Sequence, residues 1–285
     1  MTNKNKYGVL ASLLAFCIAS TYAFVAPSLQ AEESAANAEL REIRSEPGAC
    51  DQALGHVQGI ACDENAIYAV FANLICKFDW TGKLLKSTEA PFHAGDPCVA
   101  KDKLYVSMST ESAEALFEYD LDLNLTRKLK LEKCPGGDGV AYLNGKFYVG
   151  GPSSEKPHLE NYVLVYDENF NLLDEKYINY DVPTVYGPQS IASWKDRLFV
   201  AFYIDGAPKG SPCAAIVDAD LKTLAATTLD GSNGWALAPE SKQLDKSGKT
   251  ALLLVGRTLK VEGKTVAAFR WFKTDGEKVE DVTQE

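Results

Sequence analysis

One interval of seven residues recurs four times along the chain and constrains its fold more than any other feature. Each recurrence starts in a short apolar run, passes through a turn and resumes with an aliphatic or aromatic pair. The recurrences are Ile60 with Ile67-Tyr68, Pro97 with Leu104-Tyr105, Val140 with Phe147-Tyr148, and Ile191 with Leu198-Phe199. Such self-similarity predicts an architecture built from copies of one supersecondary unit.

Each unit then continues into a third run that ends in an apolar residue followed by aspartate. These pairs are Phe78-Asp79, Tyr119-Asp120, Tyr166-Asp167 and Val217-Asp218. A fifth unit starts at Trp235, has a longer first turn and ends near Gly276. The runs are short, rich in Val, Tyr, Phe and Leu, and separated by Gly, Asn and Asp, which is typical of strands. A helical solenoid would instead require apolar residues at i, i+3, i+4 and i+7.

The units start at positions 60, 97, 140, 191 and 235, so their spacings are 37, 43, 51 and 44 residues. This period is typical of four-stranded propeller blades. We therefore predict an all-β, monomeric, five-bladed β-propeller of four-stranded antiparallel blades over residues 50–285. Six blades are the alternative, but a sixth blade has no anchor, and the acidic leader at residues 32–49 is too short to form one.

The N-terminal 31 residues read as a secretory signal peptide. Lys4 and Lys6 precede an apolar run that extends to about Ala26, and small residues suit cleavage after Ala31. A retained membrane anchor is the alternative, because the run approaches the ~20 apolar residues that span a bilayer. Cleavage predicts a periplasmic or secreted protein with no membrane contact.

The charge balance argues against one class of partner. The chain has 29 Lys and Arg against 39 Asp and Glu, a net charge of -10, and no basic cluster long enough to follow a phosphate backbone. Nucleic acid is therefore not an expected partner. Removing residues 1–31 takes away two lysines and no acids, so the mature chain carries -10 - 2 = -12.

Six of the seven cysteines remain after signal cleavage, and an even number in an exported protein suggests disulfides. None has CxxC spacing. Three lie in strand-like runs and fit buried apolar positions: Cys62, Cys76 and Cys98. The other three lie in Gly/Pro-rich loops and are the better disulfide candidates: Cys50, Cys134 and Cys213.

Several short patterns resemble those of uncharacterised secreted bacterial β-propeller proteins and, more distantly, NHL and YVTN-type repeats. They are His56-x-Gln58-Gly59-Ile60, His93-x-Gly95-Asp96, Asp138-Gly139-Val140, Glu160-Asn161-Tyr162 and Tyr186-Gly187-x-Gln189. The resemblance implies the propeller fold over most of the mature chain. It leaves the activity open, because such families include binding scaffolds, lactonases and lyases.

A functional site is expected on the face where the innermost strands begin, because the loops between second and third strands also open there. Candidate ligand-binding residues on this face are His56, Gln58, His93, Asp96, Asp138, Tyr186, Gln189, Asn233, Trp235 and Arg257. The third histidine, His158, is expected in one of the same loops. The face therefore combines polar and aromatic groups from every blade.

Three classes of function fit this face. The leading hypothesis is binding of a small-molecule, glycan or protein ligand without catalysis. The alternative is a metal-assisted, lactonase-like hydrolase or lyase, and a divalent cation is then the candidate cofactor; its candidate ligands are His56, His93, Asp96 and Asp138. A structural module of a periplasmic complex is the third. The same polar residues would also serve simply to cap strand ends and bind channel waters.

Overall fold

The computed structural model describes residues 40–91, 93–108, 115–134, 136–151, 159–204, 207–231 and 233–284. The predicted signal peptide, residues 32–39 of the predicted leader and His158 lie outside these residues. Leu40–Glu285 forms one unit by its internal contacts. Within the described part of the chain, no helix has the length and apolar character needed to cross a bilayer.

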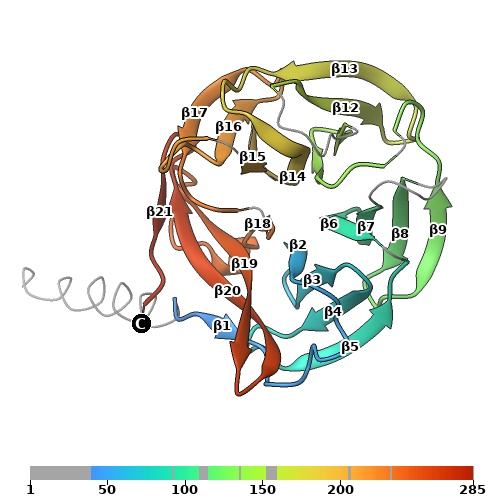
Figure 1. Cartoon of the computed structure of the whole chain (residues 1–285), viewed down its shortest axis with the longest axis vertical. Helices are drawn as coiled ribbons and strands as arrows, with labels where there is room; N and C mark the ends of the chain where they lie inside the picture. The colour runs from blue at the N-terminus through green and yellow to red at the C-terminus, as the bar shows by residue number, and fades with distance from the viewer. Residues whose placement is uncertain are drawn as a thin grey trace, which may run out of the picture. The chain divides into compact units, whose positions relative to one another are not determined.

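Five antiparallel sheets are arranged in a ring, with β2, β6, β14 and β18 near the centre and β5, β9, β13 and β17 at the rim (Figure 1). Blade 1 contains β2 (Val57–Cys62), β3 (Ile67–Phe71), β4 (Leu74–Phe78) and β5 (Leu84–Glu89). Blade 2 contains β6 (Ala94–Ala100), β7 (Lys103–Met108), β8 (Leu116–Asp120) and β9 (Leu125–Leu129). Blade 3 contains β10 (Val140–Leu143), β11 (Lys146–Gly150), β12 (Asn161–Asp167) and β13 (Leu172–Ile178). Blade 4 contains β14 (Thr184–Trp194), β15 (Arg197–Ile204), β16 (Ala214–Asp218) and β17 (Thr223–Thr227).

Blade 5 is completed by both ends of the described chain. Its inner strands are β18 (Trp235–Leu237), β19 (Ala251–Val261) and β20 (Lys264–Thr274), and a short 3₁₀ helix, η1 (Glu240–Lys242), follows β18. Two short strands pair with β20 on its outer side: β1 (Ile43–Arg44) and β21 (Val279–Asp281). The five-bladed propeller predicted from the sequence is confirmed, and the ring includes residues 43–44, which the sequence placed in the leader.

Blades 1 to 4 share the same turn between their third and fourth strands. An aspartate ends or follows the third strand, and its Oδ1 accepts hydrogen bonds from the backbone N–H groups two and four residues later. The four aspartates are Asp79, Asp120, Asp167 and Asp218. This local bonding explains why aspartate recurs at this place in the repeat.

The core lies between neighbouring blades. Every side chain of β3 is buried, whereas β5 and β9 at the rim are largely exposed. Buried residues form five clusters around the ring, one at each junction between blades. The charged side chains of the rim strands oppose edge-to-edge pairing with another molecule.

Two cysteines meet in the core between blades 5 and 1. Cys50 lies in the turns before β2, Cys76 lies in β4, and both are fully buried in one apolar cluster. The interaction between their thiols lowers the pKa of Cys50 and raises that of Cys76. The sequence predicted Cys76 to be a buried apolar residue, and it predicted Cys50, Cys134 and Cys213 to be the disulfide candidates. Cys134 instead joins the core between blades 2 and 3.

We expect Cys50 and Cys76 to form a disulfide when the protein is purified from an oxidising compartment. The two thiols lose two electrons and two protons to a disulfide-bearing oxidant, which leaves as a dithiol. The bond would tie the segment after β1 to blade 1 and stabilise the fold by about 3 kcal/mol. Mass spectrometry of non-reduced peptides should find the crosslink, and Cys76→Ser should lower the melting temperature more under non-reducing than under reducing conditions. Complete alkylation of both thiols after denaturation without reductant would contradict the pairing.

Candidate functional site

Five equivalent positions in the innermost strands form a tight ring around the channel axis. The register of each inner hairpin aligns Ile60, Pro97, Val140, Ile191 and Trp235. The residues immediately before them are Gly59, Asp96, Gly139, Ser190 and Gly234. Four of the five are therefore glycine or serine, and blade 2 alone places a carboxylate there.

The backbones of neighbouring blades approach one another closely at this level. A Cβ on Gly59 would lie 2.4 Å from Oδ1 of Asp96, and a Cβ on Gly139 would lie 2.6 Å from the side chain of Ile191. Backbone hydrogen bonds also join the blades, since the N–H of Asp96 donates to the carbonyl of Asp138 at 2.9 Å. These contacts require the small residues found at the ring.

Asp96 is fully buried within this ring. Its Oδ2 accepts hydrogen bonds from the backbone N–H of Ile191 at 2.9 Å and of Val140 at 3.3 Å, whereas Oδ1 has no hydrogen-bond partner among the described residues. Burial raises the pKa of Asp96 well above its usual value. The carboxyl group thus links blades 2, 3 and 4 from inside the channel, below the mouth where the sequence placed it.

Side chains from blades 1, 3 and 4 converge at the mouth where the inner strands begin, here called the entry mouth. The Nε2 of Gln189 donates to Oδ2 of Asp138 at 2.7 Å and to the carbonyl of Tyr186 at 2.9 Å. Tyr203 reaches across to blade 1, where its hydroxyl lies 3.2 Å from Nε2 of His56. Hydrogen bonds therefore join three residues predicted from the sequence, and a fourth, His56, reaches them through Tyr203, which packs against the ring of Tyr186.

Tyr186 presents an aromatic ring at the entry mouth. Its side chain is 42% exposed, and Tyr203 packs edge-on against it with the ring centroids 6.4 Å apart. Tyr186 and Gly187 both have positive φ, +60° and +65°, where β14 contains a bulge before Pro188. A non-glycine residue held in this conformation carries backbone strain, which is common at binding sites.

The other predicted residues occupy different surroundings. Gln58, His93 and Asn233 are half-buried near the starts of the inner strands. Trp235 is buried between blades 4 and 5, where it packs on Phe199 with a centroid separation of 5.6 Å. Arg257 pairs with Glu42 on blade 5. Among the residues that the structure describes, no group of three or more His, Cys, Asp or Glu is arranged to hold a metal ion.

A second opening lies where the inner strands end, here called the exit mouth. It contains a cavity of about 290 Å³ whose wall includes one residue after each repeat anchor, namely Ala61, Cys98, Ala141, Ala192 and Ala236. These small side chains leave the space open. Four alanines at equivalent repeat positions are the sequence signal that would have revealed it.

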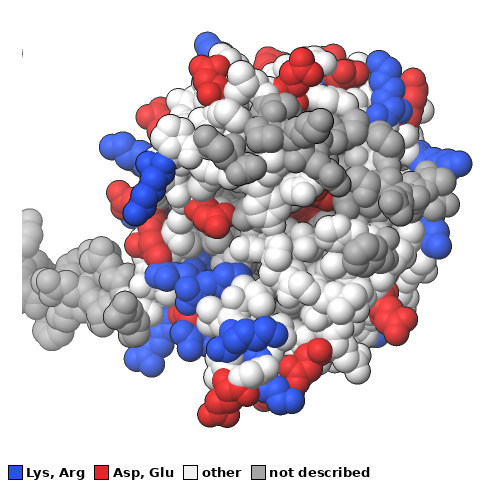
Figure 2. Space-filling model, in the orientation of Figure 1, with Lys and Arg blue, Asp and Glu red and all other residues white. Residues whose placement is uncertain are grey.

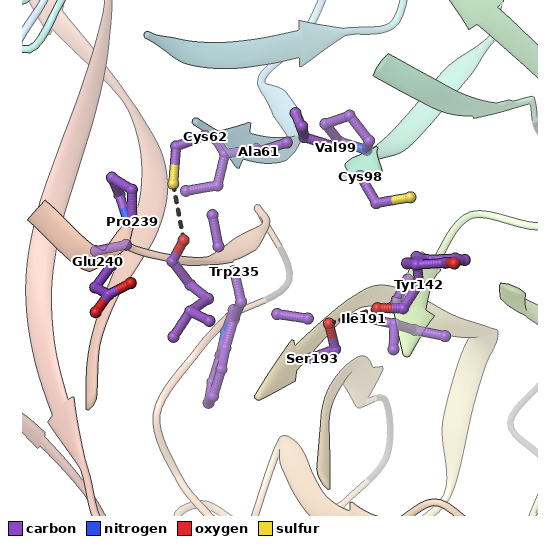
Figure 3. A pocket seen from close by; sticks show the side chains of 17 residues that line it. Ala61, Cys62, Cys98, Val99, Tyr142, Ile191, Ser193, Trp235, Pro239 and Glu240 are labelled. Atoms are coloured by element: carbon purple, nitrogen blue, oxygen red, sulfur yellow. Dashed lines mark hydrogen bonds between the residues drawn. The ribbon is translucent and has the colours of Figure 1, made fainter. Parts of the chain in front are cut away.

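Polar groups stand on two sides of the exit cavity. Figure 3 shows Cys62 and Glu240 on one side and Tyr142, Ser193 and Cys98 across the opening. The Cys62 thiol donates to the carbonyl of Leu237 at 2.9 Å. Burial raises the pKa of both Cys62 and Cys98, so the thiols are neutral at physiological pH and poor nucleophiles.

The ring of blades around a central channel defines a β-propeller. No family model matches the chain, and no curated protein sequence matches it. The fold is similar to that of glutaminyl cyclase from Myxococcus xanthus, with a TM-score of 0.56 and 12% identity over 85% of this chain and 99% of that one. The WD40 domain of Pan2 from Neurospora crassa matches with a TM-score of 0.43 and 6% identity, covering 80% of this chain and 77% of that domain. At these identities, the first similarity establishes the fold.

Proposed function

We propose that this protein is an exported, monomeric β-propeller that binds a small polar molecule or glycan at the entry mouth without transforming it. One observation carries the proposal: hydrogen bonds and ring contacts bring together side chains from three blades there. Tyr203 joins blade 4 to His56 of blade 1, and Gln189 joins blade 4 to Asp138 of blade 3. Groups supplied by separate rigid sheets are preorganised for a ligand.

The chemistry of the mouth favours a ligand with both a flat face and hydroxyl or amide groups. The exposed ring of Tyr186 offers a surface on which a sugar or other ring can stack. The Asp138 carboxylate and the amide oxygen of Gln189 place acceptors beside it, whereas the Gln189 amide N–H groups already donate within the site. In Figure 2 most charged side chains on this face lie toward its rim, and acidic atoms are visible in the hollow near its centre. A hydroxyl-rich molecule without negative charge suits this distribution.

Binding should raise the melting temperature by mass action. A hundredfold excess of ligand over its dissociation constant stabilises the folded state by about 2.7 kcal/mol, which corresponds to about 5–10 °C for a domain of this size. We would screen mono- and oligosaccharides, divalent cations and lactones by thermal shift and measure any hit by calorimetry. Tyr186→Ala and Gln189→Ala should each weaken the binding at least tenfold.

The exit mouth supplies the matched control and a second candidate site. Glu240→Gln changes that mouth alone and should leave binding unchanged if the ligand sits at the entry mouth. The cavity of about 290 Å³ favours a smaller, mostly apolar ligand with a donor facing Glu240. Loss of binding in Glu240→Gln, with binding retained in both entry-mouth variants, would move the site to the exit mouth and refute the first proposal.

Metal-assisted hydrolysis or lyase chemistry is the alternative for the entry mouth. It requires a retained divalent ion and turnover of a substrate such as a lactone. Elemental analysis of the natively purified protein, together with chromatography of the lactones after incubation, tests it directly. Stoichiometric metal with ring-opened product, both lost in His56→Ala, would establish catalysis in place of simple binding.

A further inference from the structure

A third cavity, of about 460 Å³, lies on blade 5 outside the channel. Seven residues line it: Arg41, Glu42, Arg44, Arg257, Arg270, Thr283 and Gln284. We call it the arginine pocket. Four of its seven lining residues are arginine, in a chain whose net charge is -10. Basic side chains also gather over β19 and β20 in Figure 2.

The closure of the ring creates this pocket. Arg44 of β1 pairs with Ala268 of β20, which pairs in turn with Arg257 of β19. Directly paired residues share a face of a sheet, and so do residues two apart along a strand. Arg44, Arg257 and Arg270 therefore project from the same face, although more than 200 residues separate the first from the others. Sequence inspection finds no basic run because the cluster forms only when the chain ends meet.

The charges in the pocket do not balance. Glu42 bonds to both Arg44 and Arg257, and Arg270 pairs with Asp281 of β21. Arg41 has no carboxylate partner among the residues that the structure describes. Among the residues that the structure describes here, four arginines against two carboxylates leave 4 - 2 = 2 positive charges, which matches the charge of one dianion.

Water screens the exposed Arg41 and Arg44 well and the other two arginines only in part. The Glu42 side chain is 10% exposed, and those of Arg257 and Arg270 are about one third exposed. The Nε atoms of Arg257 and Arg270 are buried and have no hydrogen-bond partner among the described residues. Partly buried like charges repel more strongly than exposed ones, and an unpaired buried donor is costly. An anion in the pocket would relieve both effects.

We propose that the arginine pocket binds the oxyanion group of a small acidic molecule, such as a phosphate, sulfate or carboxylate. The planar guanidinium group donates two parallel hydrogen bonds to such groups, which lysine cannot do. A cavity of about 460 Å³ has room for more than one oxyanion group, so the natural ligand carries further atoms. Because arginines of β1, β19 and β20 would hold it, the ligand would fasten the first strand to the last blade. The proposal does not depend on the function of the channel.

The test uses simple anions on the purified protein. Inorganic phosphate, pyrophosphate, sulfate and citrate would be titrated at constant ionic strength, with sodium chloride as the reference, by calorimetry and thermal shift. At least one oxyanion should bind saturably and raise the melting temperature above the chloride reference. If none of the four does so, the proposal is overturned.

Three variants show whether the pocket itself binds. Arg41→Gln removes a charge without breaking an ion pair and should weaken binding at least tenfold. Arg270→Lys keeps the charge but loses the planar fork, so binding should weaken several-fold. Lys273→Gln, an exposed position on the same strand, makes the same charge change as Arg41→Gln outside the pocket and should bind as wild type does. Equal losses in Arg41→Gln and Lys273→Gln, or unchanged binding in both arginine variants, would refute the assignment.

Discussion

Replacing Asp96 with alanine should lower the free energy of unfolding by about 2–6 kcal/mol, because the backbone N–H groups of Val140 and Ile191 would lose their acceptor inside the protein. An unsatisfied buried donor costs about 1–3 kcal/mol, and two are involved. Asp96→Asn should cost much less, since its amide retains an oxygen that can accept both bonds. Urea denaturation of the three proteins at one pH gives the comparison.

The asparagine variant should also change how stability depends on pH. Burial raises the pKa of Asp96 in the folded state, so the folded protein keeps a proton that the unfolded chain releases above its pKa of about 3.9. Stability from this group is full below that pKa and is lost as pH rises through the folded-state pKa. Asp96→Asn cannot ionise, and its free energy of unfolding should therefore improve relative to wild type between pH 4 and pH 8.

Asp120 provides a control of opposite sign. This exposed carboxylate accepts hydrogen bonds from Asn124, which lower its pKa. Its contribution to stability is therefore present above the unfolded-state pKa and is lost as pH falls. Asp120→Asn should be less stable than wild type at pH 7 and close to it at pH 3.

The prediction for Asp96 has a clear contrary outcome. Parallel pH profiles for wild type and Asp96→Asn would show that Asp96 ionises in the folded protein as it does in the unfolded chain.

The fold was predictable where the information is local. Each inner hairpin and each aspartate turn is encoded within about ten residues, so the repeat and the number of blades could be read from the sequence. Strand β1 could not, because its two residues carry no periodicity and pair with residues more than 200 positions away. For the same reason, sequence inspection found Arg257 but not the arginine pocket around it.

The sequence predicted at which end of the channel the candidate residues lie, but not the direction in which their side chains point. His56 and Gln189 lie where the inner strands begin, as the sequence predicted, whereas Trp235 turns into the junction between blades. A shift of one residue moves a side chain to the opposite face of a strand. Bulges shift the register near the starts of β2, β6 and β14, and one sequence does not show where they fall. Burial of Asp96 likewise depends on how closely separate blades approach.

That close approach predicts a large effect at Gly234. The residue has a φ of +102°, and a Cβ there would lie 2.3 Å from the backbone nitrogen of Ile60 and 2.6 Å from Cα of Gly59. Both contacts are with the backbone of blade 1, which cannot move aside as a flexible side chain can. Backbone strain of about 1–2 kcal/mol and overpacking of about 1–3 kcal/mol should add, so we expect Gly234→Ala to lower the free energy of unfolding by about 2–5 kcal/mol.

Gly263 in the β19–β20 turn separates the two contributions to the Gly234 effect. Its φ is +79°, but a Cβ there would meet no atom within 4 Å. Gly263→Ala should therefore show only the backbone cost of about 1–2 kcal/mol, and Gly234→Ala should lose more by the cost of forcing blades 5 and 1 apart. Urea denaturation measures both variants against wild type. Equal losses would mean that the two blades separate freely at this point, and the tight ring around Asp96 would then not be a source of stability.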